Sequence, residues 1–151
     1  MKTFKKIGAW LGGILLLLLL ISLFLPKTYH VIHTTSIKSD KMVIYNLVAN
    51  LNHWDLWAPW TKKTDSTAIF ELNGPDGTVG TKRSWNGKVI GNGEMTITGL
   101  KPGELLSYDL SFQQGKYNSK GSIIIESSGD SFKVSWTDQG DLGYNPIVSA
   151  R

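Results

Sequence analysis

Few side chains in this 151-residue sequence have the type and spacing that metal binding requires. Three histidines and no cysteine are present. His30 and His33 lie an odd number of residues apart in a predicted strand, so they point to opposite faces and cannot share a metal ion. Asp138 and Asp141 lack the alternating acidic loop and closing glutamate of a calcium-binding hand. We therefore expect neither a metal nor another cofactor.

Nucleophilic and acid–base catalysis have equally few candidates. No serine lies in a Gly-x-Ser-x-Gly turn, which holds the nucleophile of many hydrolases. Arg83 and Tyr108 share the strand parity of apolar neighbours and are therefore expected on the cavity side of a sheet. A structural role is the simpler interpretation, because a buried tyrosine hydroxyl normally finds a partner and an edge arginine extends its charge to water. We assign no catalytic residue.

Tryptophans dominate the segment from Asn52 to Trp60. Trp54 and Trp57 are three residues apart and share one face if the segment is helical, while Pro59 directs the chain towards Trp60. Our first interpretation is packing, with Trp57 as a buried plug between helix and sheet. The second is the wall of a cavity for a flat hydrophobic ligand. The third is contact with lipid headgroups, where tryptophan is enriched.

One helix and seven strands must position these side chains. Ser39 or Asp40 offers an N-cap, and apolar residues from Ile44 to Leu51 recur at helical spacing over about three turns. Beyond Trp60, turn residues separate short alternating runs, which indicates an antiparallel sheet with one apolar face and an α+β fold. The predicted strands are Tyr29–Ile37, Ala68–Leu72, Val79–Trp85, Gly93–Gly99, Leu105–Gln113, Lys120–Glu126 and Phe132–Thr137.

The run Ile7–Leu25 contains no charged residue and has 19 residues, close to the roughly 20 that a helix needs to cross a bilayer. A cleavable signal peptide is disfavoured because bulky residues stand where the peptidase needs small ones. A buried soluble helix is disfavoured because such helices are rarely apolar on all sides. We therefore predict a membrane anchor over residues 1–26 and one domain over residues 27–151.

Charge predicts the orientation of this anchor. Lys2, Lys5 and Lys6 precede the run, so its N-terminus should stay in the cytoplasm and the domain should lie on the outer side of the cell membrane. The sequence has 16 basic and 12 acidic residues; beyond these three lysines, 13 basic residues face 12 acidic ones. Such a balance is not typical of a nucleic-acid-binding domain.

Taken together, the order of elements and several short motifs resemble the helix-grip fold of the SRPBCC superfamily, which includes polyketide cyclase-like proteins, START lipid-transfer domains and the birch pollen allergen. The chain is most similar to the bacterial membrane-anchored polyketide-cyclase-like proteins. The residues that carry the resemblance are Ser39-Asp40-Lys41 with Val43 and Tyr45; Asn52, Trp54, Trp57, Pro59 and Trp60; Gly80 and Ser84-Trp85; Gly91-Asn92-Gly93 with Met95 and Ile97; and the turn 140–146.

The resemblance implies a largely apolar cavity for a lipid or another hydrophobic small molecule. Two other functions fit the same fold: a cyclase- or dehydrase-like enzyme, and an envelope domain that contacts proteins without a ligand. The ligand-binding residues expected from the motifs and the apolar strand faces are Trp57, Trp60, Arg83, Trp85, Met95, Tyr108, Leu110 and Trp136.

In related sequences a long C-terminal helix follows the turn 140–146 and closes the cavity. This chain ends at Arg151, so we expect an incomplete domain. One predicted helix covers about 10 to 12 Å, whereas seven strands span roughly 29 Å. The apolar face from Met95 to Trp136 should therefore remain largely exposed to water.

Overall fold

The computed structural model of the chain describes residues 10, 12–14, 17, 20–21 and 28–141. It divides into two units, one of Met1–Thr28 with Leu142–Arg151 and one of Tyr29–Asp141. Most of the predicted anchor, Ile7–Leu25, lies outside the described residues. Residues 142–151, where we expected the domain to be incomplete, also lie outside them. Among the residues that are described, no helix is long and apolar enough to cross a membrane.

The second unit is a helix-and-sheet domain with the predicted order of elements. They are β1 (Thr28–Ile37), α2 (Lys41–Ala49), the 3-10 helix η1 (Leu51–Leu56), β2 (Ile69–Asn73), β3 (Lys82–Gly87), β4 (Gly91–Lys101), β5 (Leu105–Phe112), β6 (Tyr117–Ser128) and β7 (Ser131–Asp141). All seven predicted strands are present, which confirms the α+β assignment. The third begins later than expected because Thr78 to Thr81 form a turn in which the Thr81 amide donates to the Thr78 carbonyl.

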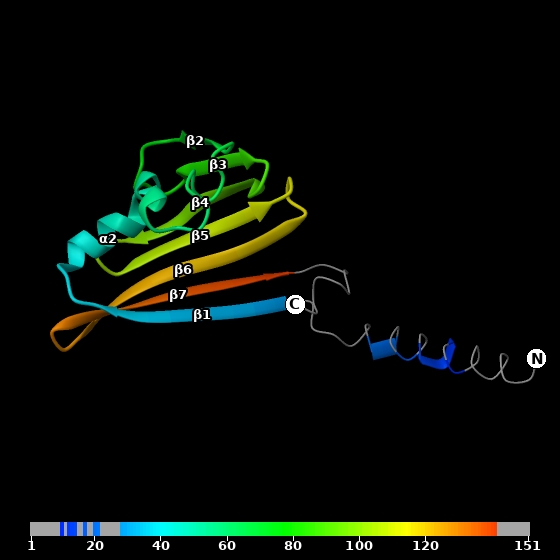
Figure 1. Cartoon of the computed structure of the whole chain (residues 1–151). Helices are drawn as coiled ribbons and strands as arrows, with labels where there is room; N and C mark the ends of the chain where they lie inside the picture. The colour runs from blue at the N-terminus through cyan, green and yellow to red at the C-terminus, as the bar shows by residue number, and fades with distance from the viewer. Residues whose placement is uncertain (1–9, 11, 15–16, 18–19, 22–27, 142–151) are drawn as a thin grey trace, which may run out of the picture. The chain divides into compact units, whose positions relative to one another are not determined.

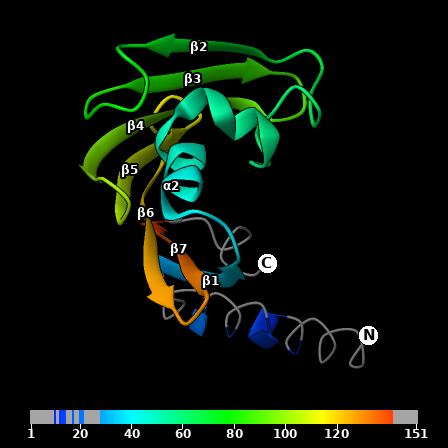
Figure 2. The same cartoon turned by 90° about the vertical axis from the view of Figure 1, so that its left-hand side faces the viewer.

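The strands form a single antiparallel sheet in the order β1-β7-β6-β5-β4-β3-β2. Thr34 of β1 lies beside Ser135 of β7, with their hydroxyl oxygens 3.3 Å apart. The sheet curves strongly around α2, which lies on its concave side (Figures 1 and 2). β1 and β2 form the two edges of the sheet.

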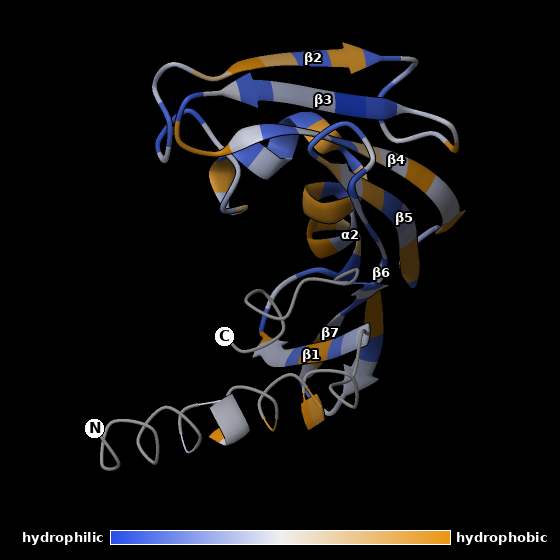
Figure 3. Cartoon of the chain, turned by 90° about the vertical axis from the view of Figure 1, so that its right-hand side faces the viewer, coloured by the Kyte–Doolittle hydropathy of each residue, from blue (hydrophilic) through white to orange (hydrophobic). Residues whose placement is uncertain are grey.

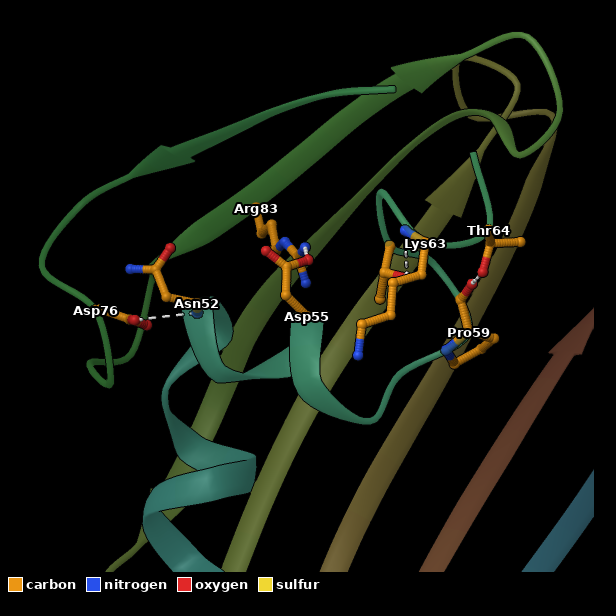
Figure 4. Close-up of polar contacts among 8 residues, drawn as sticks. Asn52, Asp55, Pro59, Lys63, Thr64, Asp76 and Arg83 are labelled. Carbon is orange, nitrogen blue, oxygen red and sulfur yellow. Dashed lines mark hydrogen bonds and ion pairs between the residues drawn. The ribbon is translucent and has the colours of Figure 1, made fainter. Parts of the chain in front are cut away.

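Helix α2 begins after Asp40, one of the two predicted caps. The Asp40 carboxylate accepts hydrogen bonds from the amides of Met42 and Val43, at 2.8 and 3.2 Å. The helix is shorter than expected, because Asn50 is extended and the chain then tightens into η1. A carboxylate from the β2–β3 loop explains this turn, since Asp76 accepts from the amide of Leu51 at 2.6 Å and of Asn52 at 3.1 Å (Figure 4).

Indole groups satisfy the carbonyls at the end of α2, which have no partner within the helix. Trp54 Nε1 donates to the Val48 carbonyl at 2.8 Å, and Trp57 Nε1 donates to the Leu47 carbonyl at 3.0 Å. The two indole rings lie 4.5 Å apart, as the spacing of three residues predicts. The segment after the helix is therefore fastened to it, and both cover the sheet together.

The core lies between this cover and the middle strands. Its buried members include Ile44 and Val48 of α2, Trp54 of η1, and Met95, Ile97, Leu106, Tyr108, Leu110, Ile123 and Ile125 of β4, β5 and β6. The expectation that this face would stay largely wet is wrong for β4 and β5, because η1 and the loop up to Ala68 extend the cover beyond the helix. α2 itself is largely apolar (Figure 3).

Asp65 fastens the loop that follows η1 to the turn between β3 and β4. Its carboxylate accepts from the Thr67 hydroxyl at 2.6 Å and from the amides of Val89 and Ile90 at 2.6 and 3.2 Å. These donors stabilise the charged form, so the pKa of Asp65 falls from 3.8 to about 2. Asp65 therefore has a structural role and remains ionised at neutral pH.

Candidate functional site

The concave side of the sheet is not covered completely, and an apolar groove of about 590 Å³ remains. It lies between the helical cover and the strands β6, β7 and β1. Its lining residues are His33, Thr34, Thr35, Ile37, Ser39, Ile44, Leu47, Val48, Leu56, Trp57, Ile123, Val134 and Trp136. The volume lies within the range typical of small-molecule sites, and most of the lining is apolar or aromatic.

Two indole rings form the aromatic part of the groove. The rings of Trp57 and Trp136 approach edge to face, with centroids 5.5 Å apart and planes at 80°. Trp54 lies behind them, fully buried, with its centroid 5.9 Å from that of Trp136. Trp57 itself is only half-buried. The packing role and the cavity-wall role that we considered for this segment are thus divided between two residues.

A hydrogen-bonded network of Tyr108, Asp138 and Tyr29 holds the indole of Trp136 in place. Its Nε1 donates to the Tyr108 hydroxyl oxygen at 2.6 Å, and that hydroxyl donates to the Asp138 carboxylate at 3.0 Å. The Tyr29 hydroxyl donates to the other carboxylate oxygen at 2.8 Å. The network joins β1, β5 and β7, so it fixes one wall of the groove to the core of the sheet.

Tyr108 acts in this network as a protonated donor. Its burial raises the pKa of the hydroxyl above the ordinary value; the hydrogen bond from Trp136 opposes this rise, and the charge of Asp138 adds to it. The pKa of Tyr29 is raised as well, chiefly by burial. Neither phenol is therefore prepared to act as a base at neutral pH, in agreement with the structural role predicted for Tyr108.

His33 is the only titratable side chain among the lining residues of the groove. It is exposed on β1, and the hydroxyls of Thr34, Thr35 and Ser39 are the other polar side-chain groups of the lining. An apolar wall with a polar margin suits a hydrophobic molecule that carries one polar group. An acid–base pair, which general acid–base catalysis would use, does not occur among these lining residues.

Arg83 differs from its predicted position. We expected its charge to extend to water, but the side chain is only 7% exposed. Arg83 Nη2 forms an ion pair with Asp55 Oδ1 at 2.6 Å (Figure 4), and the guanidinium carbon lies 4.5 Å from the centre of the Phe70 ring. The reason is that η1 places a carboxylate over β3, so the charge is neutralised at the sheet.

The other predicted ligand-binding residues lie away from the groove. Trp60 stacks on Trp85, with centroids 5.7 Å apart and planes at 12°, and both contact Phe112. Trp85 also lines a second, more polar hollow of about 420 Å³. Met95 and Leu110 are buried in the core. Of the eight predicted residues, the structure brings Trp57 and Trp136 together at the groove.

Most of the lining residues were not predicted from the sequence. Alternation along β1 places His33, Thr35 and Ile37 on the same face as Tyr29, and this signal was available from the sequence. The helical pattern included Leu47 as a core residue, whereas it lies at the exposed margin of the apolar face. Within the described part of the chain, no three histidine, aspartate or glutamate side chains gather as a metal site would require.

Comparison with known proteins shows the fold. The sequence matches no family model and no curated protein. Norcoclaurine synthase from Thalictrum flavum, in complex with dopamine and hydroxybenzaldehyde, has a TM-score of 0.62 at 14% identity, over 86% of this chain and 80% of that chain. Major latex-like protein 151 from Panax ginseng has a TM-score of 0.57 at 18% identity, over 77% and 80%.

The Aha1 dimer from Colwellia psychrerythraea is also similar, with a TM-score of 0.53 at 17% identity over 72% of this chain and 74% of that chain. All three identities are low, so these structures establish the fold and not the activity. The curved antiparallel sheet with its helical cover is the helix-grip fold that the sequence motifs predicted.

Proposed function

We propose that this chain is a membrane-anchored binding domain for a hydrophobic small molecule or lipid, which it holds in the groove between the helical cover and β6, β7 and β1. The observation that carries this proposal is the apolar groove of about 590 Å³ with Trp57 and Trp136 in its wall. Burial of apolar ligand surface there would supply the main driving force for binding.

The relatives by fold support this choice of ligand class. One of them, norcoclaurine synthase, is in complex with two small aromatic molecules, dopamine and hydroxybenzaldehyde. The edge-to-face pair of Trp57 and Trp136 offers this chain a surface for a flat ring. His33 is the single titratable lining group, which favours binding over acid–base catalysis.

The membrane location rests on the sequence. Ile7–Leu25 has the length and composition of a spanning helix, and the lysines before it favour a cytoplasmic N-terminus. Under this proposal the domain acts at the outer surface of the cell membrane. It would hold its ligand beside the bilayer without releasing the protein.

Substitution of groove residues by glutamate would test the binding proposal. Leu47 and Leu56 line the groove and are 37% and 66% exposed, so glutamate should be tolerated structurally at either position. Ile124 and Ile69 have the same exposed fractions, 37% and 66%, but lie outside the groove lining and serve as matched controls. All four variants of the full chain would be purified in the same detergent as the wild type.

Solvent extraction followed by mass spectrometry would identify the small molecules that each preparation retains. We expect a stoichiometric hydrophobic compound in the wild type and in Ile69→Glu and Ile124→Glu, and its loss in Leu56→Glu and Leu47→Glu. The proposal is wrong if the wild type carries no such compound, or if all five proteins carry it equally.

A further inference from the structure

We propose that the end of the sheet at which β1 begins is a docking surface for an anionic lipid bilayer. This inference rests on the anchor proposed above, because the apolar run ends at Leu25 and β1 begins at Thr28. Three extended residues reach about 10 Å. The start of β1 would therefore lie at the bilayer surface, together with every segment that shares this end of the sheet.

Sheet topology determines which segments share that end. Because all neighbouring strands are antiparallel, the β3–β4 turn and the β5–β6 turn lie at the end where β1 begins, as Figure 1 shows. The loop before β2 joins them, since Asp65 accepts from the amides of Val89 and Ile90 in the β3–β4 turn. We call this set of segments the anchor end of the domain.

Exposed lysines gather at the anchor end. They are Lys62 and Lys63 in the loop before β2, Lys88 in the β3–β4 turn, and Lys116 in the β5–β6 turn. Within the described part of the chain, none of the four forms an ion pair. The carboxylates at this end are Asp65, whose oxygens are held by Thr67 and two backbone amides, Asp141, and Glu94, which lies in the same row of the sheet as Asp141 and pairs with Lys82 at 2.9 Å. Apart from the Lys82–Glu94 pair, the balance is four positive charges against two negative ones.

The opposite end of the sheet is electrically different. Three lysines there are paired: Lys38 with Asp130, Lys101 with Glu104 at 2.5 Å, and Lys133 with Glu126 at 3.3 Å. Lys41, at the start of α2, lies near Glu104 without an ion pair, and Lys120 on β6 is exposed and unpaired among the residues that the structure describes. Within the described residues, unpaired lysines are therefore most numerous at the anchor end. Phosphate headgroups attract such clusters of lysine at short range, and the attraction weakens as salt screens it.

Apolar and aromatic groups accompany the lysines. Val89 at the tip of the β3–β4 turn is 74% exposed. Tyr117 lies beside Lys116, whose ammonium nitrogen is 5.3 Å from the centre of the ring. An exposed apolar tip, an amphipathic ring and cations are the groups that suit the interface between headgroups and hydrocarbon.

This orientation places the groove in the middle of the sheet and in the half that lies away from the bilayer. Ile37, at the end of β1, lies eight residues beyond Tyr29, which corresponds to about 26 Å along the strand. Ile37 and Ser39 line the groove, and so does α2, which follows them. A ligand would then enter from the aqueous side and not directly from the membrane beneath.

The absence of cysteine makes site-specific labelling direct. Val89→Cys places a fluorophore at the anchor end, and Val79→Cys places one in the loop at the other end of β3, where Val79 is 60% exposed. The labelled full chain would be reconstituted into vesicles of phosphatidylcholine with phosphatidylglycerol that contain a headgroup spin label. We expect strong quenching at Val89 and little at Val79.

A variant with glutamate at the four lysines, raised salt and vesicles of phosphatidylcholine alone should each reduce the quenching at Val89. Flotation of the proteoliposomes tests the anchor separately. A chain that fails to float would overturn the anchor proposal. A chain that floats but shows equal quenching at both positions, or quenching at Val89 that ignores charge and salt, would overturn the docking surface alone.

Discussion

Gly121 allows Tyr108 to reach its partners across the sheet. Tyr108 pairs with Gly121 in the register, and Gly121 pairs with Asp138 on the next strand. A Cβ atom at Gly121 would overlap the end of the Tyr108 ring. Gly93 beneath Trp85 shows the same arrangement. At such positions a glycine serves close packing, because the neighbouring ring occupies the space of a side chain.

Replacing Gly121 by alanine should therefore force Tyr108 away from Asp138 and Trp136. We expect Gly121→Ala to lower the free energy of unfolding by about 1 to 3 kcal/mol, the usual cost of an overpacked core. Urea unfolding of the full chain in micelles, followed by tryptophan fluorescence, measures this change.

Gly99→Ala on β4 is the matched control, because its added Cβ would meet Ser107 Cβ at an ordinary 3.5 Å. This variant should unfold close to the wild type. Equal losses in the two variants would show that the cost at Gly121 comes from backbone freedom and not from the ring of Tyr108.

At the scale of elements, α2 and η1 act as one cover, because Trp54 and Trp57 bind the last carbonyls of the helix through their indole nitrogens. The two residues differ in burial. Trp54 is fully buried among the core residues, whereas Trp57 is half-buried at the wall of the groove. The cover therefore has a structural half and a half that faces the proposed ligand.

Alanine replacements of Trp54 and Trp57 should have different effects on stability and on ligand retention. Trp54→Ala should lower the free energy of unfolding by about 3 to 5 kcal/mol, as expected for loss of a buried aromatic side chain. Trp57→Ala should lower it less but should reduce retention of the co-purified compound. The measurements are urea unfolding and mass spectrometry of the full chain. An equal loss of stability in both variants would show that Trp57 is a buried plug and not a wall of the groove.

At the scale of the whole molecule, the anchor proposal predicts where the domain lies. If Lys2, Lys5 and Lys6 hold the N-terminus in the cytoplasm, protease added to intact bacterial spheroplasts that express the chain should digest the domain. Replacing the three lysines by glutamate removes the charge bias and should protect a larger share of the chains.

Western blotting of a C-terminal tag before and after lysis measures the accessible fraction. Protection of the wild-type domain in intact spheroplasts, or its release as a soluble protein cut after the apolar run, would contradict the proposed topology.

The sequence by itself determined the elements, because alternation, helical spacing and turn residues are local properties of the chain. A cap at Ser39 or Asp40, the seven strands and the shared face of Trp54 and Trp57 followed from such patterns. Within the candidate site, the motifs and strand faces identified Trp57 and Trp136. The alternation of side chains along the strand also placed Tyr108 correctly on the inner face of the sheet. The structure shows that it is buried in the core there and does not line the groove.

Only the tertiary structure decided where the groove and the anchor end lie. Strand order places β1 beside β7, so His33 and Ile37 line the same groove as Val134 and Trp136, about a hundred residues away in sequence. The position of η1 decided that Arg83 pairs with Asp55 and that the middle strands are covered. These outcomes depend on long-range register and on which segments share one end of the sheet, and no local pattern encodes either of them.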